Sequence, residues 1–182
     1  LKGIDTLIQA IALLQQSGRH QICLSVIGGD PDGGPDEVSA EMARLQAMCQ
    51  QFGVENLVTF LGKRSQDSLP YYYSASEVVV VPSHYESFGM VALEAMACGT
   101  PVVASQVGGL AFLVQDGITG FTVPVDDPQA LCEDLAALLD NPSLRQKMGR
   151  QAAEFAREYG WEKIAARIVD LYDDVLSSVA GG

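Results

Sequence analysis

Two glutamates, Glu86 and Glu94, lie eight positions apart in the segment from Ser83 to Gly109. From Met90 to Cys98 every residue except Glu94 is apolar, which predicts a helix that is buried on nearly all sides. A buried carboxylate is costly unless it is paired or hydrogen-bonded. Glu94 therefore needs a partner, either a Lys or Arg elsewhere in the fold or the hydroxyl groups of a ligand.

The start of this predicted helix is suited to binding an anion. Four first-turn backbone N–H groups have no acceptor within the helix, and the helix dipole adds to their positive character; they belong to Phe88, Gly89, Met90 and Val91. Glu86, in the loop just ahead, either caps these N–H groups or contacts a ligand. Glu94 lies roughly 7–8 Å further along the axis. Sugar, diphosphate and ribose fit the order Glu86, helix start and Glu94, because carboxylates suit vicinal hydroxyls and N–H groups suit phosphates.

Predicted helices and strands alternate along the chain, and these elements must position the candidate residues. We expect strands within residues 21–27, 54–61, 77–81, 101–104 and 120–123, and helices over residues 4–16, 36–52, 67–76, 89–98 and 109–114. Three further helices, over residues 128–140, 142–159 and 161–178, form a helical C-terminal tail. The strands are continuous apolar runs, which predicts an α/β domain with a Rossmann-like parallel sheet covered by helices on both faces. Ligands of such sheets bind outside the carboxyl ends of the strands, in the loops after Ile27, Leu61, Val81 and Ala104.

The composition excludes several classes of protein. The chain has 182 residues, 48% hydrophobic and 19% charged, which fits a single globular domain. A formal charge of −12 disfavours nucleic-acid binding. No apolar run approaches the ~20 residues of a membrane span. Any phosphate must therefore be held by a local positive feature, such as a helix start or one lysine.

Other candidate groups favour structural roles. The cysteines, Cys23, Cys49, Cys98 and Cys132, are scattered without metal-ligand spacing and indicate reduced, buried thiols in a cytosolic protein. The three consecutive tyrosines at 71–73 point three ways on a helix, so packing is favoured over base stacking. Glycines at 28–29 and 33–34 match no phosphate-binding pattern.

Polar residues also stand in the loops ahead of two predicted helices. Asp126 and Asp127 precede Pro128, which favours an N-cap over a metal site, and we propose no metal site. His84 could act as a general base beside Glu86, and we assign it no catalytic role.

The segment resembles the E-x7-E signature of retaining GT-B glycosyltransferases, particularly the large family 4 (glycosyl transferases group 1). The resemblance covers nearly the whole chain, and its strings are Glu-Ser-Phe-Gly at 86–89, Glu-Ala-Met-Ala-Cys-Gly-Thr-Pro-Val-Val-Ala at 94–104, Val-Gly-Gly at 107–109 and Asp-Gly-Ile-Thr-Gly at 116–120. It implies that the chain is the C-terminal half of a GT-B fold. Residues 1–182 would then be a single donor-binding domain, a fragment without its N-terminal acceptor domain.

The resemblance also implies roles for individual residues. Glu86 would be catalytic, contacting the donor sugar or supporting the reacting centre, and Glu94 would hold the ribose hydroxyls. Lys2, in Leu-Lys-Gly-Ile-Asp, would bind the diphosphate, and Lys63 and Arg64 would line the base. The amides of the helix start divide between two partners: sugar hydroxyls for Phe88, Gly89 and Met90, and the diphosphate for Val91.

The implied reaction is transfer of a hexose from a nucleoside-diphosphate sugar, UDP-linked, to an acceptor hydroxyl with retention. No cofactor and no metal would be needed, because Lys2, an arginine upstream of Leu1 and the helix start would stabilise the leaving group. The protein would be cytoplasmic, with membrane association only through the absent domain, and the fragment alone would be inactive. Two alternatives stay open, a nucleotide-sugar epimerase of similar architecture and a non-catalytic nucleotide-sugar-binding module.

Overall fold

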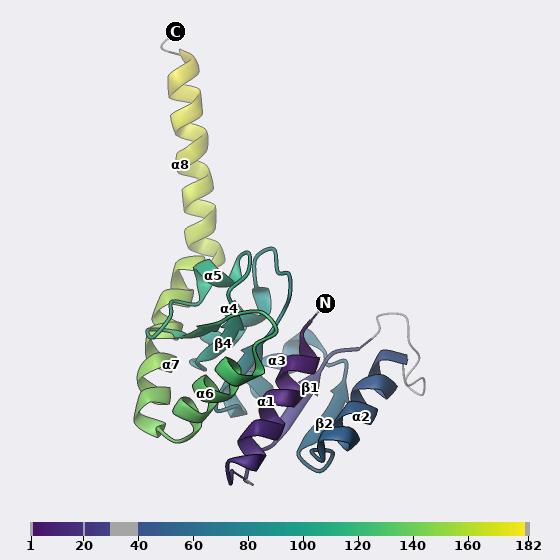
Figure 1. The fold of residues 1–182 in the computed structure, drawn as a ribbon. Helices are drawn as coiled ribbons and strands as arrows, with labels where there is room; N and C mark the ends of the chain where they lie inside the picture. The colour runs from purple at the N-terminus through teal and green to yellow at the C-terminus, as the bar shows by residue number, and fades with distance from the viewer. Residues whose placement is uncertain (1, 20, 30–39, 181–182) are drawn as a thin grey trace.

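The computed structural model describes residues 2–19, 21–29 and 40–180. The predicted loop over residues 30–34, with its glycines at 33–34, and the predicted helix start at residue 36 lie outside these residues. Helices and strands alternate as expected (Figure 1). The elements are α1 (Ile4–Gln16), β1 (Leu24–Ile27), α2 (Ala40–Phe52), β2 (Val58–Gly62), η1 (Gln66–Ser68), α3 (Leu69–Ala75), β3 (Val79–Val81), α4 (Met90–Ala97), β4 (Val102–Ser105), α5 (Leu110–Leu113), β5 (Gly120–Val123), α6 (Pro128–Leu139), α7 (Pro142–Ala156), η2 (Arg157–Tyr159) and α8 (Trp161–Ala180).

All described strand pairs are parallel, as predicted, but they form two hydrogen-bonded sheets instead of one. β1 pairs with β2, and β4 lies between β3 and β5. The backbone of β3 is hydrogen-bonded on its β4 side, where Val79 N–H donates to the carbonyl of Pro101 at 3.1 Å. The two sheets are joined by side chains, because Leu24 of β1 and Val80 of β3 pack against the same apolar core.

Helices cover both faces of the three-stranded sheet, as its continuous apolar strands predict. All four residues of β4 are buried, and their side chains alternate between two cores. Val103 belongs to the first core, formed largely by α1, α2, β2 and α6. Val102 and Ala104 belong to the second core, formed by α3, α4, α5 and α7. A strand buried on both faces explains why no polar residue interrupts it before Ser105.

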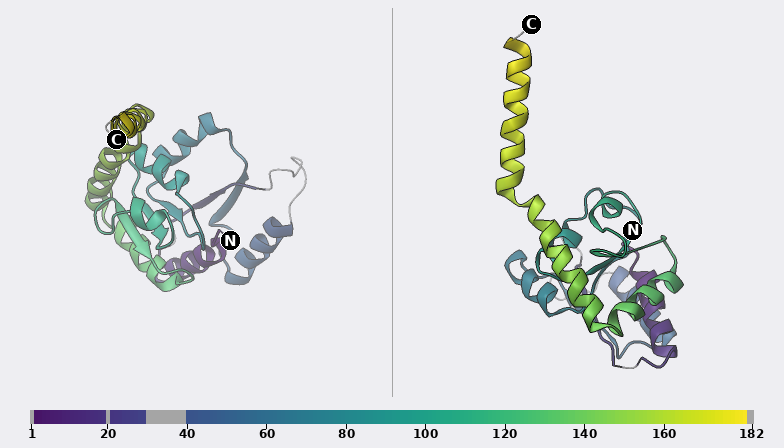
Figure 2. Two further views of the ribbon diagram at one scale, coloured as in Figure 1. Left: turned by 90° about the horizontal axis from the view of Figure 1, so that it is seen from above. Right: turned by 90° about the vertical axis from the view of Figure 1, so that its left-hand side faces the viewer.

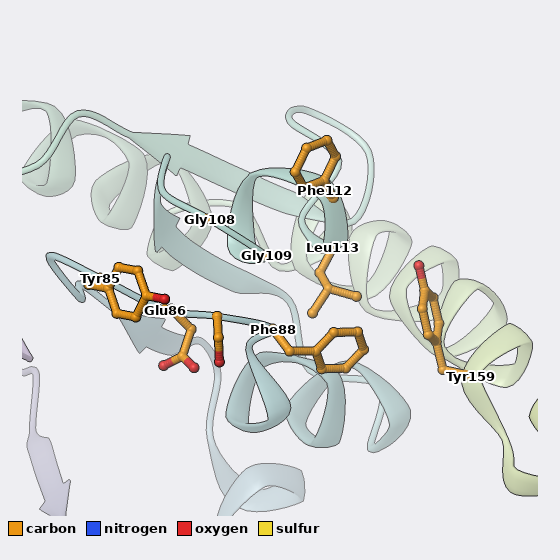
Figure 3. Close-up of a pocket in the computed structure, with 9 residues that line it drawn as sticks. Tyr85, Glu86, Phe88, Gly108, Gly109, Phe112, Leu113 and Tyr159 are labelled. Carbon is orange, nitrogen blue, oxygen red and sulfur yellow. The ribbon is translucent and has the colours of Figure 1, made fainter.

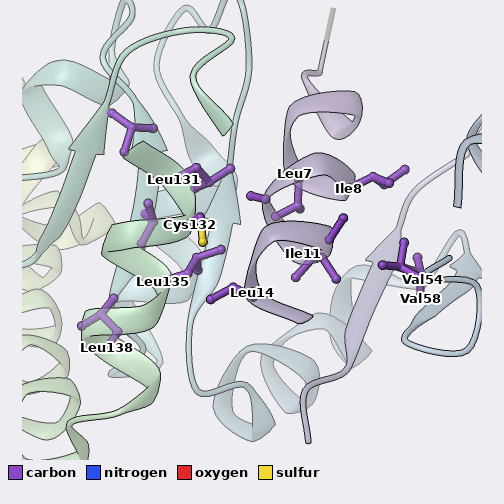
Figure 4. Packing of buried hydrophobic residues seen from close by; sticks show 14 of the residues in the cluster. Leu7, Ile8, Ile11, Leu14, Val54, Val58, Leu131, Cys132, Leu135 and Leu138 are labelled. Carbon is purple, nitrogen blue, oxygen red and sulfur yellow. The ribbon is translucent and has the colours of Figure 1, made fainter. Parts of the chain in front are cut away.

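The first core is built on the packing of α1 against α6 (Figure 4). Ile8 and Leu14 of α1 and Leu131 and Leu138 of α6 have no exposed surface. Full burial of one such side chain contributes about 1.5–3 kcal/mol, so this helix pair holds the start of the chain firmly against the sheet. The helix predicted over residues 4–16 is therefore confirmed.

The cysteine prediction is only half right. Cys49 and Cys132 are buried, but Cys23 is exposed and Cys98 is half-buried. Cys23 lies one residue ahead of β1, and Cys98 one residue after α4. Both therefore sit at element ends, where packing is incomplete.

α8 projects away from the rest of the molecule (Figures 1 and 2). Its base is held by Glu158 of η2, which pairs with Lys163 and lies 3.1 Å from Arg167. Most of its large apolar residues are exposed, namely Trp161, Ile168, Val169, Leu171, Tyr172, Val175 and Leu176. Among the described residues no helix has both the length and the apolar character needed to cross a membrane.

Candidate functional site

The loop that carries Glu86 rests on two glycines that follow β4. A Cβ on Gly108 would lie 2.0 Å from the carbonyl oxygen of Glu86, and one on Gly109 would lie 2.3 Å from that of Phe88. The Gly109 N–H also donates to the Glu86 carbonyl at 3.1 Å. Only residues without a side chain allow this close approach. The two glycines of the Val-Gly-Gly string therefore let the backbone of the Glu86 loop pack directly against their own. Reading the sequence did not assign this role.

Lys2 is brought to the same loop by the glycine that follows it. Gly3 has φ 66°, and a Cβ on it would lie 1.7 Å from the carbonyl oxygen of Pro82. The chain start therefore lies against the carboxyl end of β3. Lys2 Nζ lies 3.2 Å from Glu86 Oε2. The lysine side chain is 73% exposed and the glutamate 20% exposed, so the ammonium is accessible while the carboxylate is largely covered.

The start of α4 keeps its backbone donors free of side-chain caps. The N-cap residue is Gly89, with φ 102° and no capping side chain. Glu86 does not cap the helix; its carboxylate pairs with Lys2. The first-turn N–H groups therefore remain available to a ligand.

The prediction that α4 is buried on nearly all sides is wrong. Ala92, Ala95 and Met96 are fully buried in the second core, but Met90 is 52% and Val91 46% exposed. These two residues stand at the carboxyl edge of the sheet, where no element of the described chain covers them. An open helix start is what a ligand would need to reach the amides.

Glu94 has a partner that the sequence did not reveal. The hydroxyl of Tyr73 on α3 donates to Glu94 Oε2 at 2.9 Å. Both options read from the sequence, a Lys or Arg and a ligand, leave out a neutral donor. The lone carboxylate requires a partner, and a buried tyrosine hydroxyl requires an acceptor. These two needs together are the signal that could have linked the residues.

Lys63 and Arg64 follow β2 and are exposed. Arg64 Nε donates to the hydroxyl of Tyr72 at 2.8 Å, and its guanidinium carbon lies 5.9 Å from the centre of that ring. The structure gives neither residue a contact with Lys2, Glu86 or Glu94 among its described interactions. Arg64 and Glu94 contact adjacent residues of α3, because Arg64 bonds to Tyr72 and Glu94 bonds to Tyr73.

A small polar network joins α1 to two loops, one of which also carries Glu86. Asp126 Oδ1 lies 2.7 Å from His84 Nε2 and accepts a hydrogen bond from Thr6 Oγ1 at 3.2 Å. The predicted N-cap is confirmed for Asp127, whose carboxylate accepts from the Ala130 N–H at 2.9 Å. Asp126 instead adopts φ 56°. His84 thus ties the Glu86 loop to the loop after β5.

A hollow of about 490 Å³ lies on one side of the Glu86 loop (Figure 3). The rings of Phe88 and Tyr159 meet edge to face, with their centres 5.9 Å apart. In Figure 3 the Glu86 carboxylate lies on the other side of the loop from Phe112 and Leu113. The lining residues are Tyr85, Glu86, Ser87, Phe88, Gly108, Gly109, Phe112, Leu113 and Tyr159.

One edge of the domain thus carries an exposed lysine, a covered glutamate and an uncapped helix start. Residues 1–155 match the profile of the family described as Glycosyl transferases group 1. The chain belongs to this family.

A relative in the group 1 family, the D-inositol 3-phosphate glycosyltransferase of Streptomyces bingchenggensis (strain BCW-1), is 38% identical over 179 residues. The match covers 97% of this chain and 38% of the relative. Sucrose-phosphate synthase from Thermosynechococcus elongatus has 39% identity and a TM-score of 0.84, covering 97% of this chain and 43% of its own. Anabaena HepE in complex with UDP-glucose has 28% identity and a TM-score of 0.78, and the match covers 97% of this chain and 45% of the HepE chain.

These comparisons confirm the fold expected from the sequence. The group 1 chain has the architecture of the C-terminal domain of GT-B glycosyltransferases, with parallel strands flanked by helices. It spans about two fifths of the length of the relatives that it matches.

Proposed function

We propose that this chain is the donor-binding domain of a retaining hexosyltransferase of family 4 that uses a UDP-linked sugar. Lys2 and the α4 start hold the diphosphate, Glu94 holds the ribose, and Glu86 faces the donor sugar at the reacting centre. The observation that carries the proposal is the convergence of Lys2 and Glu86, residues far apart in sequence, to 3.2 Å beside the uncapped start of α4.

The charges at this edge suit the release of a nucleoside diphosphate. As the bond to the sugar breaks, negative charge gathers on the leaving phosphate. Fixed N–H dipoles and one ammonium group stabilise that charge without a bound metal. Lys63 and Arg64 are proposed to contact the base, with Arg64 leaving its Tyr72 contact. The similarity to HepE, a protein solved with UDP-glucose, supports UDP and a hexose as the donor class.

The acceptor side of the reaction belongs to residues outside this chain. We propose that an N-terminal domain faces the Lys2–Glu86 edge, that transfer needs both halves, and that the whole enzyme is cytoplasmic. The chain alone is then inactive in transfer but retains weak nucleotide binding, because the proposed diphosphate and ribose contacts all lie within it.

Titration calorimetry of the folded chain with millimolar UDP, GDP and ADP tests the proposal. We expect binding that is strongest for UDP. The Glu94→Ala variant should lose more UDP binding than thermal stability, although it also leaves the buried Tyr73 hydroxyl without its acceptor, at a cost of about 1–3 kcal/mol. Glu154→Ala, an exposed change on α7, is the control. Absence of heat with all three nucleotides refutes the proposal, and unfolding by Glu94→Ala without ligand makes Glu94 a structural group. Turnover of a UDP-sugar by the longer protein without acceptor points to an epimerase.

A further inference from the structure

Glu94 sits on a short helix whose core-facing side is fixed, yet a glutamate side chain has several rotatable bonds. Ordering such a chain at the moment of binding costs conformational entropy. A contact that orders it beforehand removes that cost. The structure contains one such contact, the hydrogen bond from the Tyr73 hydroxyl to Glu94 Oε2 at 2.9 Å.

We infer that Tyr73 is a positioning residue that holds Glu94 ready for the ribose of the nucleotide. This inference rests on the proposed function. The hydroxyl occupies Oε2, and no hydrogen bond to Oε1 exists among the described residues. Oε1 is thus the oxygen left to accept from a ribose hydroxyl.

The body of Tyr73 is itself firmly placed. The residue is only 7% exposed, and it packs in the second core with Ala92, Ala95 and Met96 of α4. The Thr100 hydroxyl, which is buried, donates to the Tyr73 carbonyl at 2.7 Å. Two hydrogen bonds therefore join α3 to α4 and the turn that follows it. One is made by the hydroxyl of Tyr73 and the other by its backbone carbonyl. An anchor that is rigid can restrict the group it holds.

The protonation of Tyr73 suits this role. Burial, together with the hydrogen bond to Glu94, raises the pKa of the Tyr73 phenol. The hydroxyl therefore stays a donor throughout the physiological pH range.

The two neighbouring tyrosines provide a contrast. Tyr71 is 78% exposed, and Tyr72 accepts from Arg64. Only Tyr73 combines a buried ring with a hydroxyl directed to Glu94. The Tyr-Tyr-Tyr run thus contains one positioning residue and one matched control.

The test compares UDP with 2′,3′-dideoxy-UDP, which lacks both ribose hydroxyls. Hydrogen bonds to a charged acceptor predict that the wild-type chain discriminates between them by about tenfold or more. In Tyr73→Phe we expect discrimination to fall to about threefold or less, with affinity for the dideoxy analogue unchanged. Tyr71→Phe should retain full discrimination. Equal weakening of both ligands, or unchanged discrimination, overturns the inference.

Two further measurements keep the inference testable. Thr100→Val loosens α3 while keeping the Tyr73 hydroxyl, and we expect a smaller loss of discrimination; if Tyr73→Phe does not fold, unchanged discrimination in Thr100→Val refutes the inference. If the wild-type chain binds no nucleotide, the proposed function has failed. The positioning claim is then decided by crystal structures of the ligand-free chains, in which an unmoved Glu94 carboxylate in Tyr73→Phe overturns it.

Discussion

Lys2 Nζ and Glu86 Oε2 lie 3.2 Å apart, so the two charged groups proposed for the diphosphate and for the sugar of the donor neutralise each other in this structure. The lysine is 73% exposed, and ion pairs with such an exposed member contribute about 0–1 kcal/mol. A diphosphate can therefore take Lys2 from Glu86 at little cost. Once Lys2 has left, the Glu86 carboxylate is free to contact the sugar.

Glu86→Gln should separate nucleotide binding from sugar binding. The substitution releases Lys2, so UDP affinity should stay equal or rise by about twofold, since the lost pair is weak. UDP-glucose should lose its advantage over UDP, because the sugar loses a charged acceptor. Parallel titrations with the two ligands check this. A drop in UDP affinity as large as that of UDP-glucose would contradict it.

Gly109→Ala should destabilise the domain through a steric clash beneath the Glu86 loop. Its Cβ would lie 2.3 Å from the Phe88 carbonyl oxygen, and overpacking of this kind costs about 1–3 kcal/mol. Gly29→Ala is the matched control, because a Cβ there has no neighbour within 4 Å. Urea unfolding of both variants measures the difference. Equal midpoints would mean that the loop moves freely.

Asp126 should show the cost of its left-handed backbone. Both Asp126→Ala and Asp126→Gly remove the acceptor for His84 and Thr6, but only alanine keeps a Cβ at φ 56°. We expect the alanine variant to be less stable than the glycine variant by about 1 kcal/mol. Thermal unfolding of the pair tests this. A more stable alanine variant would show that the loop relaxes.

Asp134 should make the domain less stable as pH rises. Burial, with the charges of Asp116 and Glu133, raises its pKa from 3.8 to about 6. The folded state binds this proton more tightly than the unfolded state, so its stabilising effect is complete below pH 4 and lost as pH rises through about 6. Asp134→Asn should therefore raise the free energy of unfolding by about 1–2 kcal/mol at pH 7.5.

Denaturant unfolding at pH 4 and pH 7.5 checks this prediction. The gain from Asp134→Asn should shrink as the pH falls. Asp173→Asn on the exposed face of α8 is the control and should change little at either pH. A gain that is constant with pH would assign the effect to packing instead of charge.

Local patterns were sufficient to predict most elements. The continuous valines of β3 and the apolar β4 are typical of a doubly covered sheet, and Gly18 and Pro82 follow the ends of α1 and β3. The division into two sheets was not predictable. It depends on backbone hydrogen bonds between strands, which side-chain periodicity does not encode.

The site was predictable to the extent that one segment carries it. The α4 start and Glu94 could be singled out because orphan N–H groups and a lone carboxylate have physical needs. The partners of these groups are distant in sequence: Lys2 reaches Glu86 through the fold of Gly3 onto Pro82, and Tyr73 reaches Glu94 through the packing of α3. Such pairings arise from topology, so a single sequence names the need without naming the partner.

The straight, free-standing α8 turns small rotations at its base into large translations at its tip. Twenty residues extend about 30 Å, so a tilt of about 10° at Gly160 moves the far end by about 5 Å. Gly160 directly follows Tyr159, whose ring touches Phe88 at the start of the proposed sugar-binding amides. A spectroscopic label near Leu176 would therefore report, by distance, on rearrangements of the Phe88–Tyr159 contact.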